Sequence, residues 1–153
     1  AFILGQVSQG IEPIWSNSYV KDIAKIKTTI KNPFLEDLLE EKGQNTTEVW
    51  RSIRDFDGSV QHLDFLSENE KDVFKTYPEI DQNVIVYQAA NRQNHIDQGQ
   101  SINVMVHPDM PIKDVNNIYI TAWKLGIKSM YYQHSMNAAQ KFKQKKSCDS
   151  CEG

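Results

Sequence analysis

The last third of the chain combines strand-like and helix-like patterns in an order that restricts the possible folds. Residues 101–106 alternate in polarity with a period of two and stop at a His-Pro pair, as a strand does. Residues 115–125 carry apolar side chains at helical spacing, and Gly126 suits the position just after a helix end. Residues 127–133 form a second strand-like run. A strand, a helix and a strand in this order predict a βαβ unit with parallel strands, and therefore an α/β fold.

Helix start and stop signals precede this unit. Asn32 and Pro33 are typical of an N-cap and a first helical position, and Gly43 is typical of a helix end. Thr46 or Thr47 can cap the next helix. We therefore expect two short amphipathic helices in this stretch.

Two further helices are expected between this stretch and the βαβ unit. Ser67 and Glu70 have the spacing of a capping box, in which each side chain satisfies a free backbone N–H of the other residue. Residues 81–96 contain no helix breaker and have apolar residues around much of their surface, which predicts a helix buried on more than one side. By contrast, residues 5–13 contain two glycines and a proline and are expected to be irregular.

Composition excludes several classes of function. The chain has 153 residues, enough for one domain with a core, and a net charge of −3, which argues against a general nucleic-acid-binding protein. No apolar run approaches the roughly 20 residues of a membrane span, and the first residues lack the pattern of an export signal. A soluble, cytoplasmic protein whose partners are small molecules and other proteins is expected.

The only two cysteines, Cys148 and Cys151, lie close together at the end of the chain, after a lysine-rich stretch. Such a pair can form a disulfide and exchange it with other thiols, and nearby lysines favour the reactive thiolate. Half of a zinc site and an incidental pair are the alternatives, although zinc needs four ligands and His134 is the nearest further candidate. Residues 134–153 lose the apolar pattern and are expected to form a mobile tail.

Two other features could carry chemistry. Tyr131 and Tyr132 are adjacent at the end of the second strand-like run. Neighbours on a regular strand point to opposite faces, so one buried and one exposed ring is the ordinary result, and the rings can meet only where the strand ends or is distorted. Residues 94–101 are polar and join the long helix to a strand; they can lie beside a site, but for His95 a simple role in the turn is favoured.

Three short segments, taken in order, resemble the large subunit of class I ribonucleotide reductases. They are residues 10–13 (Gly-Ile-Glu-Pro), residues 96–101 (Ile-Asp-Gln-Gly-Gln-Ser) and residues 128–133 (Lys-Ser-Met-Tyr-Tyr-Gln), and the cysteine pair follows them. The resemblance covers essentially the whole chain. It implies the C-terminal part of a ten-stranded α/β barrel at residues 1–133, followed by a redox tail at residues 134–153.

The resemblance also implies roles for individual residues. Tyr131 and Tyr132 fall on a stacked pair that relays a radical from a cofactor in the small subunit to the active-site cysteine. Cys148 and Cys151 fall on a pair that reduces the active-site disulfide and is itself reduced by thioredoxin or glutaredoxin. Ala1 would lie at the edge of the loop that holds the diphosphate of the ribonucleoside diphosphate substrate. No metal or cofactor is expected to bind this chain itself.

The chain departs from the family by lacking the active-site cysteines, which would have to come from a complementary N-terminal part of the large subunit. A naturally split gene, a mature C-terminal piece and a truncated sequence are the three explanations that remain. The expected role is therefore in deoxyribonucleotide biosynthesis for DNA replication, in complex with other chains. The alternatives are a stand-alone thiol-redox or interaction module that uses the tail, and a non-enzymatic βαβ binding domain.

Overall fold

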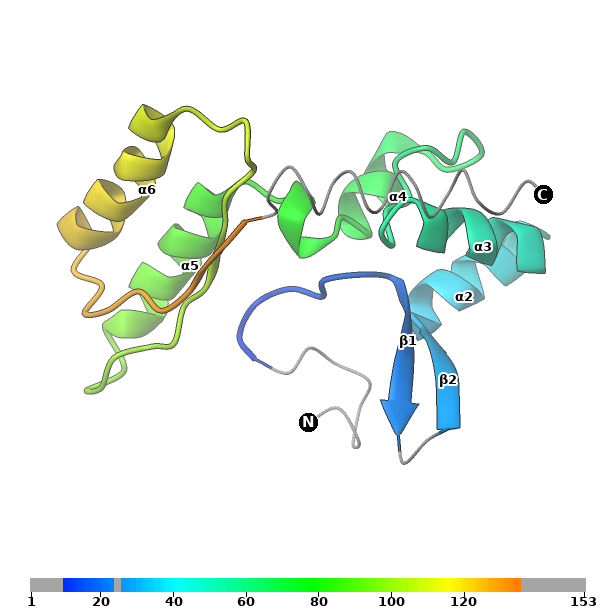
Figure 1. The fold of residues 1–153 in the computed structure, drawn as a ribbon, viewed down its shortest axis with the longest axis horizontal. Helices are drawn as coiled ribbons and strands as arrows, with labels where there is room; N and C mark the ends of the chain where they lie inside the picture. The colour runs from blue at the N-terminus through cyan, green and yellow to red at the C-terminus, as the bar shows by residue number, and fades with distance from the viewer. Residues whose placement is uncertain (1–9, 24–25, 136–153) are drawn as a thin grey trace. The chain divides into compact units, whose positions relative to one another are not determined.

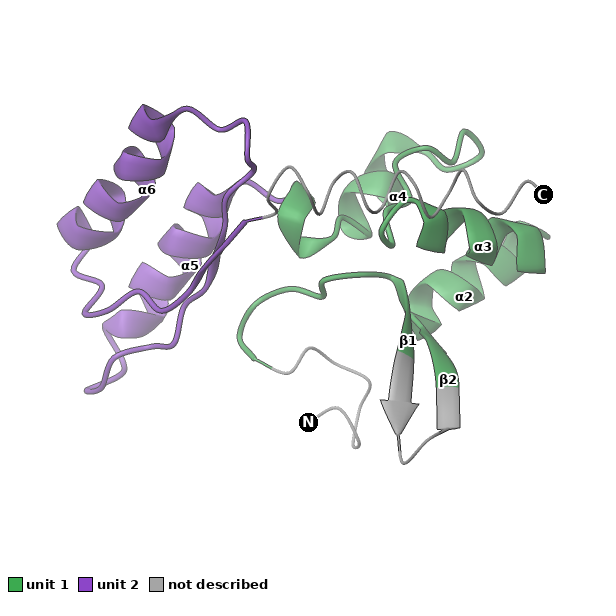
Figure 2. Cartoon of the chain, in the orientation of Figure 1, with its two compact units in different colours: residues 1–79 green, residues 80–153 purple. Residues whose placement is uncertain are grey.

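A computed structural model describes residues 10–23 and 26–135, without the side chains of residues 21–23 and 26–27. The chain divides into two compact units, Ala1–Glu79 and Ile80–Gly153 (Figure 2). Among the described residues, no helix is long and apolar enough to cross a membrane. The expected boundary between a barrel part and a tail at residue 133 stays a prediction, because residues 136–153 lie outside the described range.

A β-hairpin that the sequence patterns did not reveal opens the first unit (Figure 1). Strand β1 (Ser18–Ile23) pairs with strand β2 (Ile26–Lys31) in antiparallel register, from Ser18 opposite Lys31 to Ile23 opposite Ile26. Its base is closed by the backbone N–H of Asn32, which donates to the carbonyl of Asn17 at 2.8 Å. The two asparagines that flank the hairpin in sequence therefore lie next to each other at its base.

Three helices follow the hairpin, and each starts where the sequence predicts. Helix α2 (Pro33–Glu41) is capped by Asn32, and helix α3 (Thr47–Asp55) by Thr46. Helix α4 (Glu68–Val73) begins at the predicted capping box of Ser67 and Glu70. The apolar faces of α2 and α3 and the segments around α4 enclose the core of this unit, made of Leu35, Leu39, Trp50, Ile53, Val60, Leu63, Leu66 and Phe74.

The second unit contains the predicted βαβ arrangement. Strand β3 (Val104–Met105), helix α6 (Ile112–Lys124) and strand β4 (Gln133–His134) follow one another, and the two strands are parallel. Gly126, at a φ of 79°, lies just after the C-cap of α6, as predicted. Helix α5 (Gln82–Gln93) precedes this arrangement and packs against α6 and β3.

The two strands of this unit are shorter than predicted. Both strands were expected to cover six or seven residues, yet the parallel ladder joins only Val104 to Gln133 and Met105 to His134. Just before the ladder its regular pattern is interrupted, because the carbonyl of Ile102 accepts from the N–H of Tyr131 and the N–H of Tyr132 donates to Oδ1 of Asn103 instead. The expectation that α5 is buried on more than one side was also wrong. Val84 and Tyr87 are exposed, since α6 and β3 cover only the other side of the helix.

Candidate functional site

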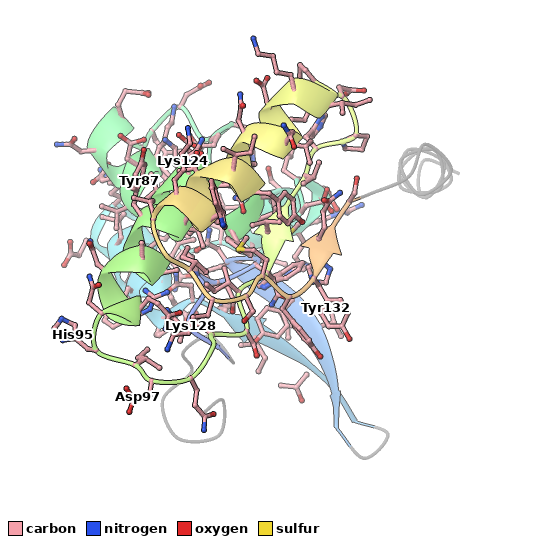
Figure 3. All side chains as sticks on the ribbon, turned by 90° about the vertical axis from the view of Figure 1, so that its left-hand side faces the viewer. Tyr87, His95, Asp97, Lys124, Lys128 and Tyr132 are labelled. Carbon is pink, nitrogen blue, oxygen red and sulfur yellow. The ribbon has the colours of Figure 1, made fainter. Side chains whose placement is uncertain are left out.

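Two of the segments singled out in the sequence lie against each other in the second unit. The ammonium group of Lys128 donates to the backbone carbonyls of Ile96, at 3.4 Å, and of Asp97. The hydroxyl of Ser129 donates to the carbonyl of Gln100 at 3.4 Å. Figure 3 shows Asp97 and Lys128 at the same end of α5. The loop after α5 and the segment that leads into β4 therefore meet, although about thirty positions separate them.

Buried glutamine side chains hold this loop, residues 96–100, in place. The amide of Gln93 donates to the carbonyls of Ile96 at 3.0 Å and Gln98 at 2.9 Å. The amide of Gln100 donates to the carbonyl of Ala89 on α5 at 2.8 Å, which ties the end of the loop to the helix. His95 is exposed, and its backbone N–H donates to the carbonyl of Arg92 at 2.9 Å, which agrees with a role in the turn.

Tyr131 and Tyr132 are both exposed and are in contact. Their side chains are 59% and 57% exposed, so the ordinary pattern of one buried and one exposed ring is wrong here. The ring centroids are 4.1 Å apart and the ring planes are inclined by 57°, so the rings are tilted rather than stacked in parallel. The two rings meet because the residues lie before the β4 ladder, where the chain is not a regular strand.

Backbone contacts fix the chain at the tyrosine pair. The N–H of Tyr131 donates to the carbonyl of Ile102 at 2.8 Å, and the N–H of Val104 donates to the carbonyl of Tyr132 at 2.9 Å. The N–H of Tyr132 donates to Oδ1 of Asn103 at 3.2 Å. Hydrogen bonds therefore join the backbone of both tyrosines to residues 102–104, at the start of β3.

The two phenol groups interact directly. A hydrogen bond to Tyr132 raises the pKa of Tyr131, and electrostatic repulsion from Tyr132 adds to this shift. The ring of His134 lies 5.9 Å from that of Tyr132. Two phenol rings in contact offer a route for an electron from one ring to the other.

Other predicted site residues cannot be placed. Ala1, Cys148 and Cys151 lie outside the described residues. Within residues 10–23 and 26–135, no group of three or more His, Cys, Asp or Glu side chains could hold a metal ion. Sequence reasoning gave no role to Asn103 or Lys128, and the signal at position 103 was only that asparagine is depleted in strands.

Comparison with known proteins identifies the family. Residues 1–133 match the family model described as the barrel domain of ribonucleotide reductase. The chain belongs to this family. Its α/β elements are therefore part of the reductase barrel domain.

Individual relatives agree with this assignment. The large subunit of ribonucleoside-diphosphate reductase from Invertebrate iridescent virus 3 is 43% identical over 138 residues, which are 88% of this chain and 22% of the relative. The alpha subunit from Chlamydia trachomatis is 35% identical over 133 residues, 86% of this chain and 12% of the relative.

A solved structure agrees as well. The class Id ribonucleotide reductase alpha subunit of Actinobacillus ureae superposes with a TM-score of 0.80 at 55% identity, over 91% of this chain and 25% of that chain. The chain thus spans a quarter or less of each of these three reductases.

Proposed function

We propose that this chain acts as part of a ribonucleotide reductase large subunit and carries a radical between Tyr131 and Tyr132 during the reduction of ribonucleoside diphosphates. The observation that supports this role most directly is the contact of the two phenol rings, whose centroids are 4.1 Å apart. A small subunit would supply the radical cofactor, and other parts of the large subunit would supply the active-site cysteines.

The pair is suited to coupled transfer of an electron and a proton. When one residue is a neutral phenoxyl radical, it takes an electron from the other ring and a proton from the other phenol oxygen. The first residue becomes a phenol and the second becomes the radical, so charge is conserved on each ring. Coupled transfer therefore forms no phenol cation radical.

The same proposal gives Cys148 and Cys151 the role of an electron shuttle. The two thiols would attack the active-site disulfide, pass two electrons and two protons to it, and become a disulfide themselves. Thioredoxin or glutaredoxin would then reduce that disulfide. The spacing of the pair and the lysines before it support this role.

Single replacements in the assembled reductase test the radical-transfer role. We expect Tyr131→Phe and Tyr132→Phe to keep the ring packing, to remove the transferable proton and to abolish turnover. Tyr87→Phe is the matched control, because Tyr87 is a similarly exposed tyrosine, at 53%, on α5 of the same unit. Turnover should be unchanged in the control. Full turnover in either of the first two variants would contradict the proposal.

The shuttle has its own test. Replacing Cys148 and Cys151 with serine should abolish turnover driven by thioredoxin and leave turnover driven by a small dithiol intact. Loss of both activities, or of neither, would contradict the shuttle role and leave the tyrosine role unaffected.

A further inference from the structure

The tyrosine pair has little packing of its own. More than half of each side chain is exposed, so no core surrounds the rings and fixes their positions. Their positions depend instead on the backbone that carries them. The contacts with Ile102, Asn103 and Val104 hold that backbone at the pair and after it. The segment just before the pair, residues 128–130, needs another support.

We propose that Lys128 and Gly99 are positioning residues for the tyrosine pair, because they hold the segment before Tyr131 against the loop of residues 96–100. This inference rests on the radical-transfer function proposed above. It gives a role to two residues outside the pair, and its failure can be told apart from failure of that function.

Lys128 provides the first contact. Its ammonium group, three residues before Tyr131, donates to two carbonyls of the loop, those of Ile96 and Asp97. A hydrogen bond with a charged donor is stronger than one between neutral groups. Both carbonyls belong to exposed residues, so water can replace the ammonium if Lys128 is removed. Loss of Lys128 should therefore release the segment with little effect on folding.

Gly99 provides the second contact. A Cβ atom at this position would lie 2.6 Å from the Oγ atom of Ser129 and 3.7 Å from its Cβ atom. The first distance is a steric overlap and the second is ordinary contact, so a side chain on residue 99 would displace the hydroxyl of Ser129, which lies two positions before Tyr131, from the carbonyl of Gln100. No positive φ is recorded at Gly99, so an alanine there would act through Ser129 and not through backbone strain.

The loop is a firm support for these contacts. Its carbonyls at Ile96 and Gln98 accept hydrogen bonds from Gln93, whose side chain is buried. Gln100 is buried as well and is bonded to Ala89 on α5. Because the loop is bonded to α5, contacts with the loop can fix the position of residues 128–130 relative to α5.

The test uses the complete reductase with its small subunit. Lys128→Met removes the ammonium at similar side-chain length, and Lys128→Arg keeps a charged donor. Gly99→Ala introduces the overlap, and adding Ser129→Ala removes it again by deleting Oγ, with Ser129→Ala alone as the measure of what the hydrogen bond from Oγ to the carbonyl of Gln100 contributes. Lys75→Met is the control, since Lys75 is a partly exposed lysine of the other unit that also has a partner, Asp72 at 2.7 Å.

The measurements are kcat, KM for the ribonucleoside diphosphate, and the radical trapped on 3-aminotyrosine placed at position 131 or 132, detected by electron paramagnetic resonance. A displacement of about 1 Å in a reacting group costs up to about 100-fold in rate, so we expect Lys128→Met and Gly99→Ala to lower kcat about 10- to 100-fold. KM should not change. The radical trapped at the second ring of the path should decrease while that at the first ring persists.

Rescue separates positioning from a general structural effect. Lys128→Arg and the Gly99→Ala/Ser129→Ala double variant should recover most of the rate and of the second radical, and Lys75→Met should match the wild type. Wild-type rates in Lys128→Met and Gly99→Ala would overturn the inference. So would equal loss of both radicals, or losses that the rescue variants do not reverse. Active Tyr131→Phe or Tyr132→Phe variants would instead overturn the proposed function itself.

Discussion

Asn17 is the polar residue whose replacement should most weaken the first unit. Its side chain is 1% exposed, and its amide donates to the carbonyls of Gly58 at 2.9 Å and Phe74 at 2.8 Å. Its Oδ1 atom accepts from the amide of Asn32 at 2.9 Å. One side chain thus connects the base of the hairpin to the turn after α3 and to the end of α4. Asn17→Ala would remove all three hydrogen bonds.

The expected cost follows from the number and burial of these bonds. A net contribution of about 0.5–1.5 kcal/mol for each bond gives about 1.5–4.5 kcal/mol for the three, with about 2–4 kcal/mol as the central range. The carbonyl of Phe74 loses the Asn17 amide, whereas that of Gly58 keeps the backbone N–H of Asn17 at 3.3 Å. Asn17→Asp keeps the acceptor but loses both amide donors and buries a charge, so it should be at least as destabilising as Asn17→Ala.

Amide hydrogen exchange measures this effect locally, within the full protein. A loss of 2–4 kcal/mol corresponds to exchange about 30- to 1000-fold faster, at about 1.4 kcal/mol for each factor of ten. The amides to follow are that of Asn32, which donates to the carbonyl of Asn17 across the base of the hairpin, and that of Asn17, which donates to the carbonyl of Gly58. The control is Asn45→Ala, which removes one bond, that from the indole of Trp50 at 2.7 Å, from an exposed asparagine. Acceleration in Asn17→Ala no greater than in the control would refute the reasoning.

Two further predictions concern titrating groups. The backbone N–H of Ser67, followed by Lys42 and the Ser67 hydroxyl, lowers the pKa of Glu70, so its contribution to stability should be present above the ordinary carboxyl pKa and should be lost as the pH falls through the lowered value. Glu70→Gln should therefore make the urea midpoint less sensitive to acid, and an unchanged acid dependence would contradict this. Tyr132→Phe should return the pKa of Tyr131 toward its ordinary value, because the hydrogen bond that raises it is lost. Ultraviolet titration of tyrosinate, with Tyr87→Phe as the control, measures the change.

The sequence predictions were correct for features that depend on interactions between residues close together in the sequence. The starts of α2, α3 and α4 were predicted correctly because Asn32, Thr46 and Ser67 each bond to a backbone N–H two or three residues ahead. The end of α6 was predicted because Gly126 adopts a positive φ that few other residues tolerate. Such bonds are readable because both partners lie within one short window of sequence.

Long-range contacts decided what the patterns missed. The base of the hairpin is joined to the rest of its unit through Asn17, whose partners are 41 and 57 positions away. The ladder of β3 and β4 is interrupted on one side where the N–H of Tyr132 donates to the side chain of Asn103, 29 positions earlier in the chain. A periodic pattern within a short stretch of sequence carries no information about a partner so many positions away.

For the candidate site, the sequence by itself determined which residues are present: two adjacent tyrosines, a lysine three residues earlier and a polar loop with a glycine. The pattern of a regular strand would have separated the two rings, and only the tertiary structure brings them together, 4.1 Å apart. The physical reason is that the loop after α5 binds the side chain of Lys128, and the residues beside β3 bind the backbone of Tyr131 and Tyr132 before the ladder begins. The sequence specifies the chemistry of the side chains, whereas the distance between them depends on contacts between segments that are far apart in the sequence.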